Sequence, residues 1–298
     1  DVDDSEEGGI DYTYAITVHE VAHQWWAHQV IGADVLGATM LSESLSEYVA
    51  LKVLEHDLGK PEMRKFLKKA LDGYLMQRTM ERKREKALMY NDGQGYIRYQ
   101  KGSLVFYALS DYLGEEKLNN ALKKYVEKVK FQEAPYTTSL EMVNYIKEVT
   151  PDSLKYVIKD MFETVTLYKN RIVDAKSTAL ENGKYKVDIE FEVSKYRNDE
   201  KGKKYYGQKV GDTLSYTNEK LSKPLLSVKL EDYIDIGIFT EEEKDGVKKE
   251  KQLYLEKHKI TQIRNTISII VDKKPIEVGV DPYNKLIDTK SDDNRMKL

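Results

Sequence analysis

The amino-acid sequence predicts an α+β protein in which helices come first and antiparallel strands follow. Residues 1–168 carry helical signals, clearest in the charged segment 63–86, where apolar side chains recur at helical spacing. Beyond this region the apolar period changes to two, which is typical of half-buried strands. We therefore predict a helical domain over 1–168, an antiparallel β-sandwich over 169–288 and a polar, frayed tail over 289–298.

Start and stop signals divide the first part into helical segments. Gly32 ends the first segment, Gly59 ends the second and Pro61 opens the third. Thr138 or Ser139 is placed to cap a later helix. The predicted helices span residues 16–31, 40–58, 63–86, 99–113, 115–128, 140–147 and 152–162.

Strands are predicted where apolar and charged residues alternate over several positions. The clearest runs are residues 187–193, 234–238 and 267–271. Clusters of Gly, Asn, Asp and Lys separate these runs and predict turns between them. This succession of strands and turns indicates the antiparallel sandwich.

Composition limits the kind of protein and the kind of chemistry. The 298 residues are 40% hydrophobic and 33% charged, a mixture typical of a globular protein. A net charge of −3 gives no electrostatic reason to expect nucleic acid as a partner. Cysteine is absent, which excludes disulfides, thiolate metal sites and a cysteine nucleophile. No apolar run approaches the roughly 20 residues that cross a bilayer.

The motif His19-Glu20-Val21-Ala22-His23 carries the strongest chemical signal. Two histidines four residues apart lie on one helical face, where both imidazoles can reach one metal ion. The glutamate between them is placed to take a proton from a water molecule on that metal. Taken alone, the pattern is also compatible with a structural helix that happens to bear two histidines.

A third protein ligand is available on the next predicted helix. A zinc site with two histidines needs one more protein ligand and leaves the fourth position open. Glu43 in Leu41-Ser42-Glu43-Ser44 offers that carboxylate. Glu47, one turn further, either accepts the second ring N–H of a ligand histidine or is a solvent-exposed helix carboxylate.

These residues resemble the gluzincin zinc aminopeptidases, the family of alanyl aminopeptidase and leukotriene hydrolase. The shared motifs are His-Glu-Val-Ala-His-Gln-Trp-Trp and Leu-Ser-Glu-Ser, against the family's Leu-Asn-Glu-Gly. The resemblance implies a bound zinc ion with His19, His23 and Glu43 as ligands and Glu20 as general base. Residues 24–42 are one residue longer than the family spacing, and we assign the extra residue to a loop over 32–39.

The resemblance also assigns a tyrosine that stabilises the oxyanion. The family has it in a Tyr-x-Lys-Gly motif, which Tyr99-Gln100-Lys101-Gly102 matches residue by residue. A phenol near the metal provides the donor that a tetrahedral intermediate requires. Tyr99 is therefore the candidate, with Tyr96 as the alternative if the segment is shifted by one turn.

Most of the chain resembles a bacterial subgroup in which the peptidase region follows a transporter-permease-like membrane segment. This resemblance implies that the longer protein is associated with a bacterial membrane. The acidic N-terminus lacks methionine, so we expect a C-terminal fragment. The family's Gly-x-Met-Glu-Asn strand, which holds the substrate's free amine, is missing from residues 1–18. We therefore expect weak activity or none from this chain alone.

The two tryptophans after the motif have a structural interpretation. Trp25 and Trp26 are expected to pack in the core. His28 is five residues beyond His23, off the ligand face, and is expected to pack or to face solvent.

Together these observations predict the helical lobe of a thermolysin-like zinc peptidase domain followed by a β-sandwich. The predicted reaction is zinc-dependent hydrolysis of peptide bonds, with removal of N-terminal residues from peptide substrates. The first alternative is an inactive peptidase-like domain that binds a peptide or a partner beside a transporter. In a second alternative the zinc ion is purely structural, but structural sites are closed by a fourth protein ligand.

Overall fold

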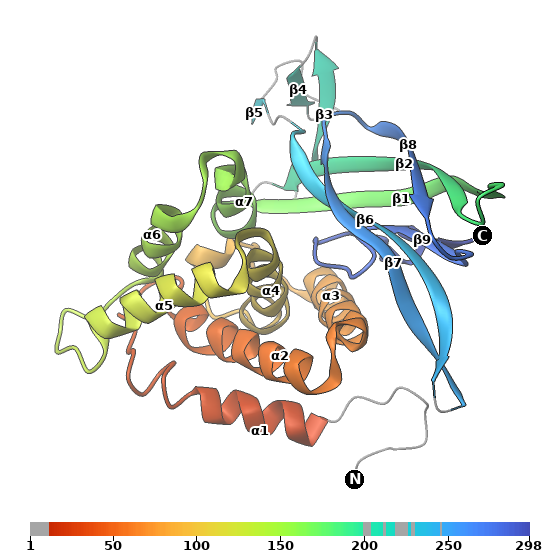
Figure 1. Ribbon diagram of the computed structural model, residues 1–298. Helices are drawn as coiled ribbons and strands as arrows, with labels where there is room; N and C mark the ends of the chain where they lie inside the picture. Colours follow the sequence, from red (N-terminus) through yellow and green to blue (C-terminus); the bar gives the residue numbers. More distant parts are fainter. Residues whose placement is uncertain (1–11, 199–203, 211–212, 218–225, 228–229, 245) are drawn as a thin grey trace. The chain divides into compact units, whose positions relative to one another are not determined.

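The computed structural model describes residues 12–198, 204–210, 213–217, 226–227, 230–244 and 246–298. The chain divides into two compact units, the first ending at Thr166 and the second starting at Leu167. The first unit is helical and the second consists of antiparallel strands (Figure 1). This arrangement confirms the predicted α+β class.

The helical unit contains seven α-helices with short 3-10 and π segments between them in the described residues. The α-helices are α1 Tyr12–Ala22, α2 Leu45–Leu58, α3 Met63–Met80, α4 Gly102–Leu113, α5 Glu115–Val129, α6 Ser139–Val149 and α7 Lys155–Ile158. The π segments are η1 Met40–Ser44, η4 Ile97–Lys101 and η6 Lys159–Glu163, and the 3-10 segments are η2 Lys60–Glu62, η3 Leu88–Tyr90 and η5 Asp152–Leu154.

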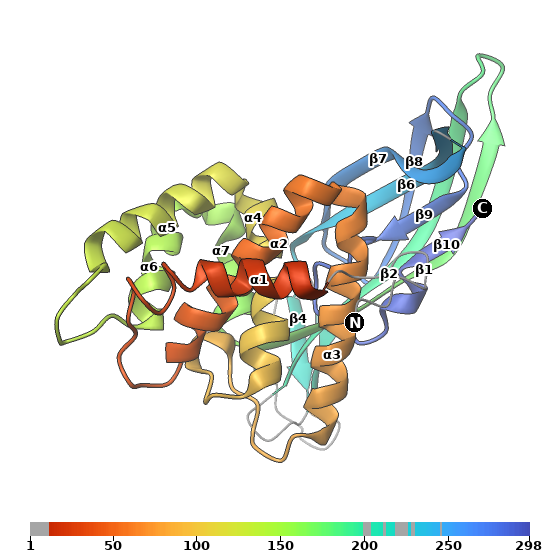
Figure 2. The ribbon, with the colours of Figure 1, turned by 90° about the horizontal axis from the view of Figure 1, so that it is seen from below.

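Helix α4 is the centre of this unit. It is buried over almost its whole length, as expected for a helix that is apolar on all sides. Helix α1 lies alongside α2 in both views (Figures 1 and 2). Helix α6 begins at the predicted cap, because the side chain of Thr138 accepts a hydrogen bond from the amide of Glu141.

Two predicted helix ends are wrong. Helix α1 ends at Ala22 and does not continue to residue 31. The chain reverses there: Ala27 has a φ of 111°, and Trp26 turns into the core with 6% of its surface exposed. Helix α3 ends at Met80 rather than at residue 86, and the extended chain that follows brings Glu85 to the buried ammonium of Lys101.

The second unit contains two antiparallel sheets. The larger has the order β1-β2-β3-β4-β5, with β8 also paired to β2, and the smaller has the order β10-β9-β6-β7. Pairings of β2 with β3 and β8, and of β6 with β7 and β9, are antiparallel. The strands are β1 Val165–Ala179, β2 Tyr185–Asn198, β3 Lys204–Val210, β4 Thr213–Thr217, β5 Leu226–Ser227, β6 Asp232–Lys244, β7 Val247–Ile260, β8 Arg264–Val271, β9 Glu277–Val280 and β10 Arg295–Lys297.

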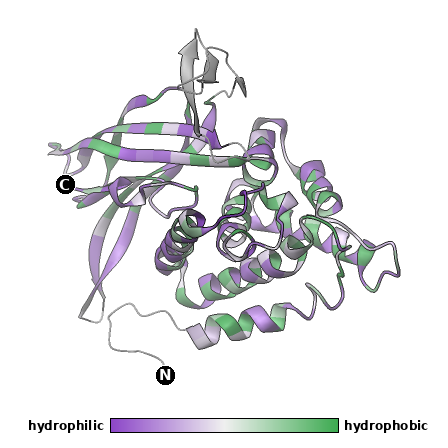
Figure 3. Ribbon diagram, turned by 180° about the vertical axis from the view of Figure 1, so that it is seen from behind, coloured by the Kyte–Doolittle hydropathy of each residue, from purple (hydrophilic) through white to green (hydrophobic). Residues whose placement is uncertain are grey.

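The predicted alternation of apolar and polar residues indicates which side chains form the core of this unit. Hydrophobic and hydrophilic residues alternate along much of β2 (Figure 3). The apolar set of β2, Val187, Ile189, Phe191 and Val193, is buried. The last residues are not frayed as predicted, because Arg295, Met296 and Lys297 pair with β9 after the 3-10 segment η7 Ser291–Asp293.

Candidate metal centre

The two motif histidines lie at the C-terminal end of α1. His19 is buried in the last turn of the helix, and His23 follows one residue after its end. Their ring centroids are 4.8 Å apart and the ring planes are nearly perpendicular, at 86°. A four-residue spacing puts both side chains on one face, so two imidazole nitrogens are presented to the same space.

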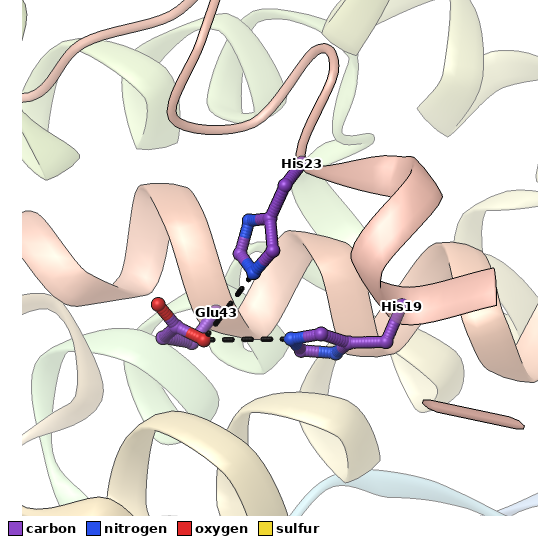
Figure 4. Close-up of side chains that lie close together, drawn as sticks. All are labelled: His19, His23 and Glu43. Atoms are coloured by element: carbon purple, nitrogen blue, oxygen red, sulfur yellow. Dashed lines mark ion pairs between the residues drawn. The ribbon is translucent and has the colours of Figure 1, made fainter. Parts of the chain in front are cut away.

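Glu43 meets these rings from the π segment η1, which leads into α2. Its Oε2 lies 3.5 Å from Nε2 of His19 and 3.7 Å from Nε2 of His23. Figure 4 shows both rings directed toward this carboxylate. Single-turn π segments inside helices are frequent at functional sites, and η1 supplies the third donor here.

The donor set and its spacing fit a zinc ion. Two donor atoms about 2.1 Å from one tetrahedral ion lie about 3.4 Å apart. The two distances to Glu43 are close to that value, and all three donor atoms lie within 4.8 Å of one another. Among the residues that the structure describes, no other group of three histidines or carboxylates shares a space in this way. Three protein ligands leave a fourth position open for water or substrate.

The second ring nitrogen of each histidine faces a polar neighbour. Nδ1 of His23 lies 2.8 Å from the carbonyl oxygen of Trp26 and 3.2 Å from Oγ of Ser46. An N–H at Nδ1 donates to that carbonyl, which leaves the lone pair of Nε2 for a metal. Nδ1 of His19 lies 3.1 Å from Oε1 of Glu47, although it is not aimed along a well-directed hydrogen bond.

Without a metal ion, the histidine and carboxylate groups of the cluster shift one another's pKa values. Burial lowers the pKa of His19, but the neighbouring carboxylates of Glu43 and Glu47 outweigh it and raise the pKa to about 9. The hydrogen bond with His19 is the largest effect that lowers the pKa of Glu43 to about 2, against the opposing effect of burial. The cluster is therefore an ion pair without metal, and a metal ion displaces the proton on His19.

Tyr99 lies beside this cluster on the π segment η4. Its ring centroid is 6.0 Å from that of His19, and its phenol is among the neighbours that lower the pKa of Glu43. Burial, together with that carboxylate, raises the pKa of Tyr99, so the phenol keeps its proton at neutral pH. Tyr96 is buried against Tyr74 at a ring distance of 5.7 Å, which makes it part of the packing around α3.

Glu20 is exposed on α1 and lines a cavity of about 560 Å³ that also reaches His19 and Tyr99. Helices α2 and α3 contribute apolar side chains to the same cavity. These are Ala50, Leu51, Leu54, Phe66 and Ala70. The cavity therefore joins the metal-ligand cluster to an apolar space large enough for a side chain.

Sequence reasoning missed the outer contacts of the site. The carbonyl of Trp26 and the hydroxyl of Ser46 have no sequence signal, since both reach His23 only after the chain turns. Trp25 was predicted to pack in the core, but 46% of its surface is exposed. Trp26 is buried at the reversal beside Ala27, which confirms the prediction for this second tryptophan.

Comparison with known proteins shows the family to which the chain belongs. No match is found among curated proteins. Among solved structures, the chain is similar to a mutant M1 zinc metallopeptidase from Deinococcus radiodurans bound to a Tyr-Ser-Ala substrate, with 21% identity and a TM-score of 0.39. That similarity covers 50% of this chain and only 32% of the other, so this chain spans about a third of that protein's length. The model of the peptidase family M1 domain matches residues 1–164, and the chain belongs to that family.

Proposed function

We propose that this chain is the metal-binding part of a zinc peptidase that hydrolyses peptide bonds. The observation that carries the proposal is the meeting of His19, His23 and Glu43 around one space. Tyr99 stands beside it, and Glu20 opens onto the same cavity. Membership of the M1 peptidase family supports the same chemistry.

Each polar residue has a role that its chemistry allows. A bound zinc ion supplies a Lewis acid that polarises the scissile carbonyl. Glu20 takes the proton of the attacking water and passes it to the leaving amine. Tyr99 donates a hydrogen bond to the substrate oxygen as negative charge grows on it. Glu47 and the carbonyl of Trp26 orient the ligand histidines through their second ring nitrogens.

The substrate is proposed to be a peptide from which the N-terminal residue is removed. The apolar lining of the cavity favours a large apolar side chain next to the scissile bond. The N-terminal preference rests on the resemblance of the motifs to aminopeptidases, whose amine-holding glutamate has no counterpart in residues 1–18. A membrane-associated longer protein is proposed from the resemblance to the bacterial subgroup in which the peptidase region follows a transporter-permease-like segment.

Metal content is the first test. The purified chain, freed of chelators and incubated with a modest excess of zinc, is analysed by elemental mass spectrometry beside Glu43→Ala. Glu127→Ala, which removes an exposed carboxylate on α5, is the matched control. We expect about one zinc per chain in the parent and the control, and a loss in Glu43→Ala. Equal zinc in all three would remove Glu43 from the ligand set.

Peptide hydrolysis separates the proposal from its alternative. Peptides with a free amine and their N-acetylated forms are compared on the zinc-loaded chain. Cleavage of the free-amine peptides alone supports an aminopeptidase, and cleavage of both supports an endopeptidase. Zinc binding together with peptide binding but without cleavage supports the inactive interaction domain instead.

A further inference from the structure

An ion pair is buried next to the segment that carries Tyr99. Nζ of Lys101 lies 3.2 Å from Oε1 of Glu85, and their side chains are 1% and 9% exposed. Lys101 is the last residue of η4, two positions after Tyr99. Glu85 lies in the extended segment after α3, so the pair ties this segment to η4.

Glu85 is the centre of a larger polar cluster. It accepts hydrogen bonds from the guanidinium of Arg78 and from the phenol of Tyr74. The ammonium of Lys101 lies 5.6 Å from the centre of the Tyr74 ring. Burial raises the pKa of Glu85, but the charges of Lys101 and Arg78 outweigh it and lower the pKa, so the carboxylate stays ionised. Its charge is therefore matched by two cations and a phenol donor.

The other side of η4 is fixed to the helix that carries the metal ligand. Oγ of Ser44, the neighbour of Glu43, donates a 2.6 Å hydrogen bond to the carbonyl oxygen of Arg98. Gly102 packs directly on Ser44, where a Cβ atom would lie 2.1 Å from Oγ. Tyr99 thus sits on a short π segment that is held to η1 through Ser44 and to α3 through Glu85.

Stabilisation of the fold is by itself a weak explanation for a buried ion pair. Taking a lysine and a glutamate out of water has a large desolvation penalty, and well-packed apolar replacements are often neutral or stabilising. The buried rings of Tyr74 and Tyr96 already provide apolar surface beside the cluster. A buried ion pair does fix the distance and direction between its two side chains, since few arrangements of the side chains satisfy both charges.

We propose that Lys101 and Glu85 are positioning residues that hold Tyr99 beside His19 and Glu43. This role rests on the proposed function, in which Tyr99 donates to the substrate oxygen. The position of the Tyr99 ring can be tested independently of the proposed function, because it concerns where the ring lies in the metal-free chain. Neither residue touches substrate in this scheme; both act through the backbone of η4.

The test replaces the pair by apolar side chains, Lys101→Met with Glu85→Leu. A second variant, Glu85→Gln, keeps the shape and an acceptor for Tyr74 while removing the charge. The matched control is Lys68→Met with Asp72→Leu, which removes an exposed 2.6 Å ion pair on α3. Far-UV circular dichroism and thermal melting establish that each variant is folded.

The positional readout uses 3-fluorotyrosine incorporated at position 99 alone and observed by fluorine NMR. In the parent chain the resonance is expected to move when His19 is replaced by alanine, because the two rings are neighbours. The control pair keeps that response. In the apolar pair and in Glu85→Gln the resonance is expected to broaden or shift and to lose most of its response to His19→Ala. An unchanged spectrum in a folded variant of either kind overturns the proposal.

Activity gives the second readout where the parent chain hydrolyses peptides. We expect kcat to fall at least about tenfold in the apolar pair, with KM and zinc content unchanged, since a displaced donor weakens only the transition state. In a Tyr99→Phe background the same replacement is expected to have no further effect. A further equal loss in that background would assign the pair a role other than positioning Tyr99. Where the parent chain has no activity of its own, the fluorine result alone decides the positioning.

Discussion

Gly102 and Ser44 approach so closely that a methyl group on Gly102 would lie 2.1 Å from Oγ of Ser44 and 2.5 Å from its Cβ. These residues belong to different helical segments, one leading from Tyr99 and the other following Glu43. The glycine of the Tyr-x-Lys-Gly motif is therefore explained by packing: it lets the segment with the phenol lie against the segment with the metal ligand. It has no need of an unusual backbone conformation.

Gly102→Ala is expected to destabilise the fold by about 1–3 kcal/mol, because the added methyl overlaps Ser44 and forces the two segments apart. Urea unfolding followed by circular dichroism measures the change. Gly95→Ala is the control, since nothing lies within 4 Å of its added Cβ. Ser44→Gly combined with Gly102→Ala should recover part of the loss, and no recovery would contradict the steric explanation.

Glu20→Gln is expected to keep zinc and lose peptide hydrolysis. The amide has nearly the same shape as the carboxylate but cannot accept a proton, and general-base catalysis contributes typically about 10²–10⁴-fold. Zinc content and hydrolysis are measured on the same preparation. Full hydrolysis in this variant would remove Glu20 from the mechanism.

Glu47→Ala is expected to weaken zinc binding by about tenfold or more without removing a ligand. The carboxylate lies 3.1 Å from Nδ1 of His19, and groups that orient a ligand histidine typically contribute about 10–100-fold to metal affinity. Competition with a fluorescent chelator measures the dissociation constant. Glu55→Ala, on the same helix and paired with Lys52, should bind zinc like the parent; an equal loss in both variants would indicate general damage to α2.

Zinc binding is expected to release about one proton near pH 7.5 and to strengthen as pH rises. In the metal-free chain the pKa of His19 is about 9, whereas its ordinary value is 6.5. Below pH 9 zinc must displace this proton, so its apparent affinity rises about tenfold per pH unit up to that value. Calorimetry in buffers of different ionisation enthalpy counts the proton.

The same shift affects the stability of the metal-free chain. Because the folded pKa of His19 lies above its unfolded value, its contribution is fully present below pH 6.5 and is lost as pH rises through 9. The melting temperature without metal should therefore fall over this interval by more than that of His19→Ala. A pH-independent difference between the two chains would contradict the raised pKa.

Ala70→Trp is expected to obstruct the apolar part of the cavity. Ala70 lies on α3 in the lining shared with Glu20 and Tyr99, and an indole occupies much of the space for a substrate side chain. Hydrolysis of peptides with a large apolar residue should decrease more than that of alanine peptides, with zinc content unchanged. Equal loss for both substrates would argue against a side-chain pocket at this position.

Local signals in the sequence account for much of the helical unit. The segment 40–58 and the cap at Thr138 follow from neighbouring residues, and the structure contains both. The metal-ligand candidates also come from local patterns on two consecutive helices, which the structure brings together. Local patterns could not reveal where α1 ends, because Trp26 is buried through contacts that form only when the chain turns back. Glu85 was unremarkable in sequence, since its three partners lie 7 to 16 residues away.

The π segment η1 affects how many residues can lie between His23 and Glu43 in the sequence. A turn closed by i→i+5 hydrogen bonds holds one residue more than an α-helical turn over the same stretch. A single-residue insertion can therefore be stored inside the helix itself, directly at Glu43, and need not lengthen the loop before it. Counting residues between motif positions is then a poor guide to ligand identity in such a chain. What matters is that the carboxylate returns to the metal-facing side after the surplus residue has been taken up.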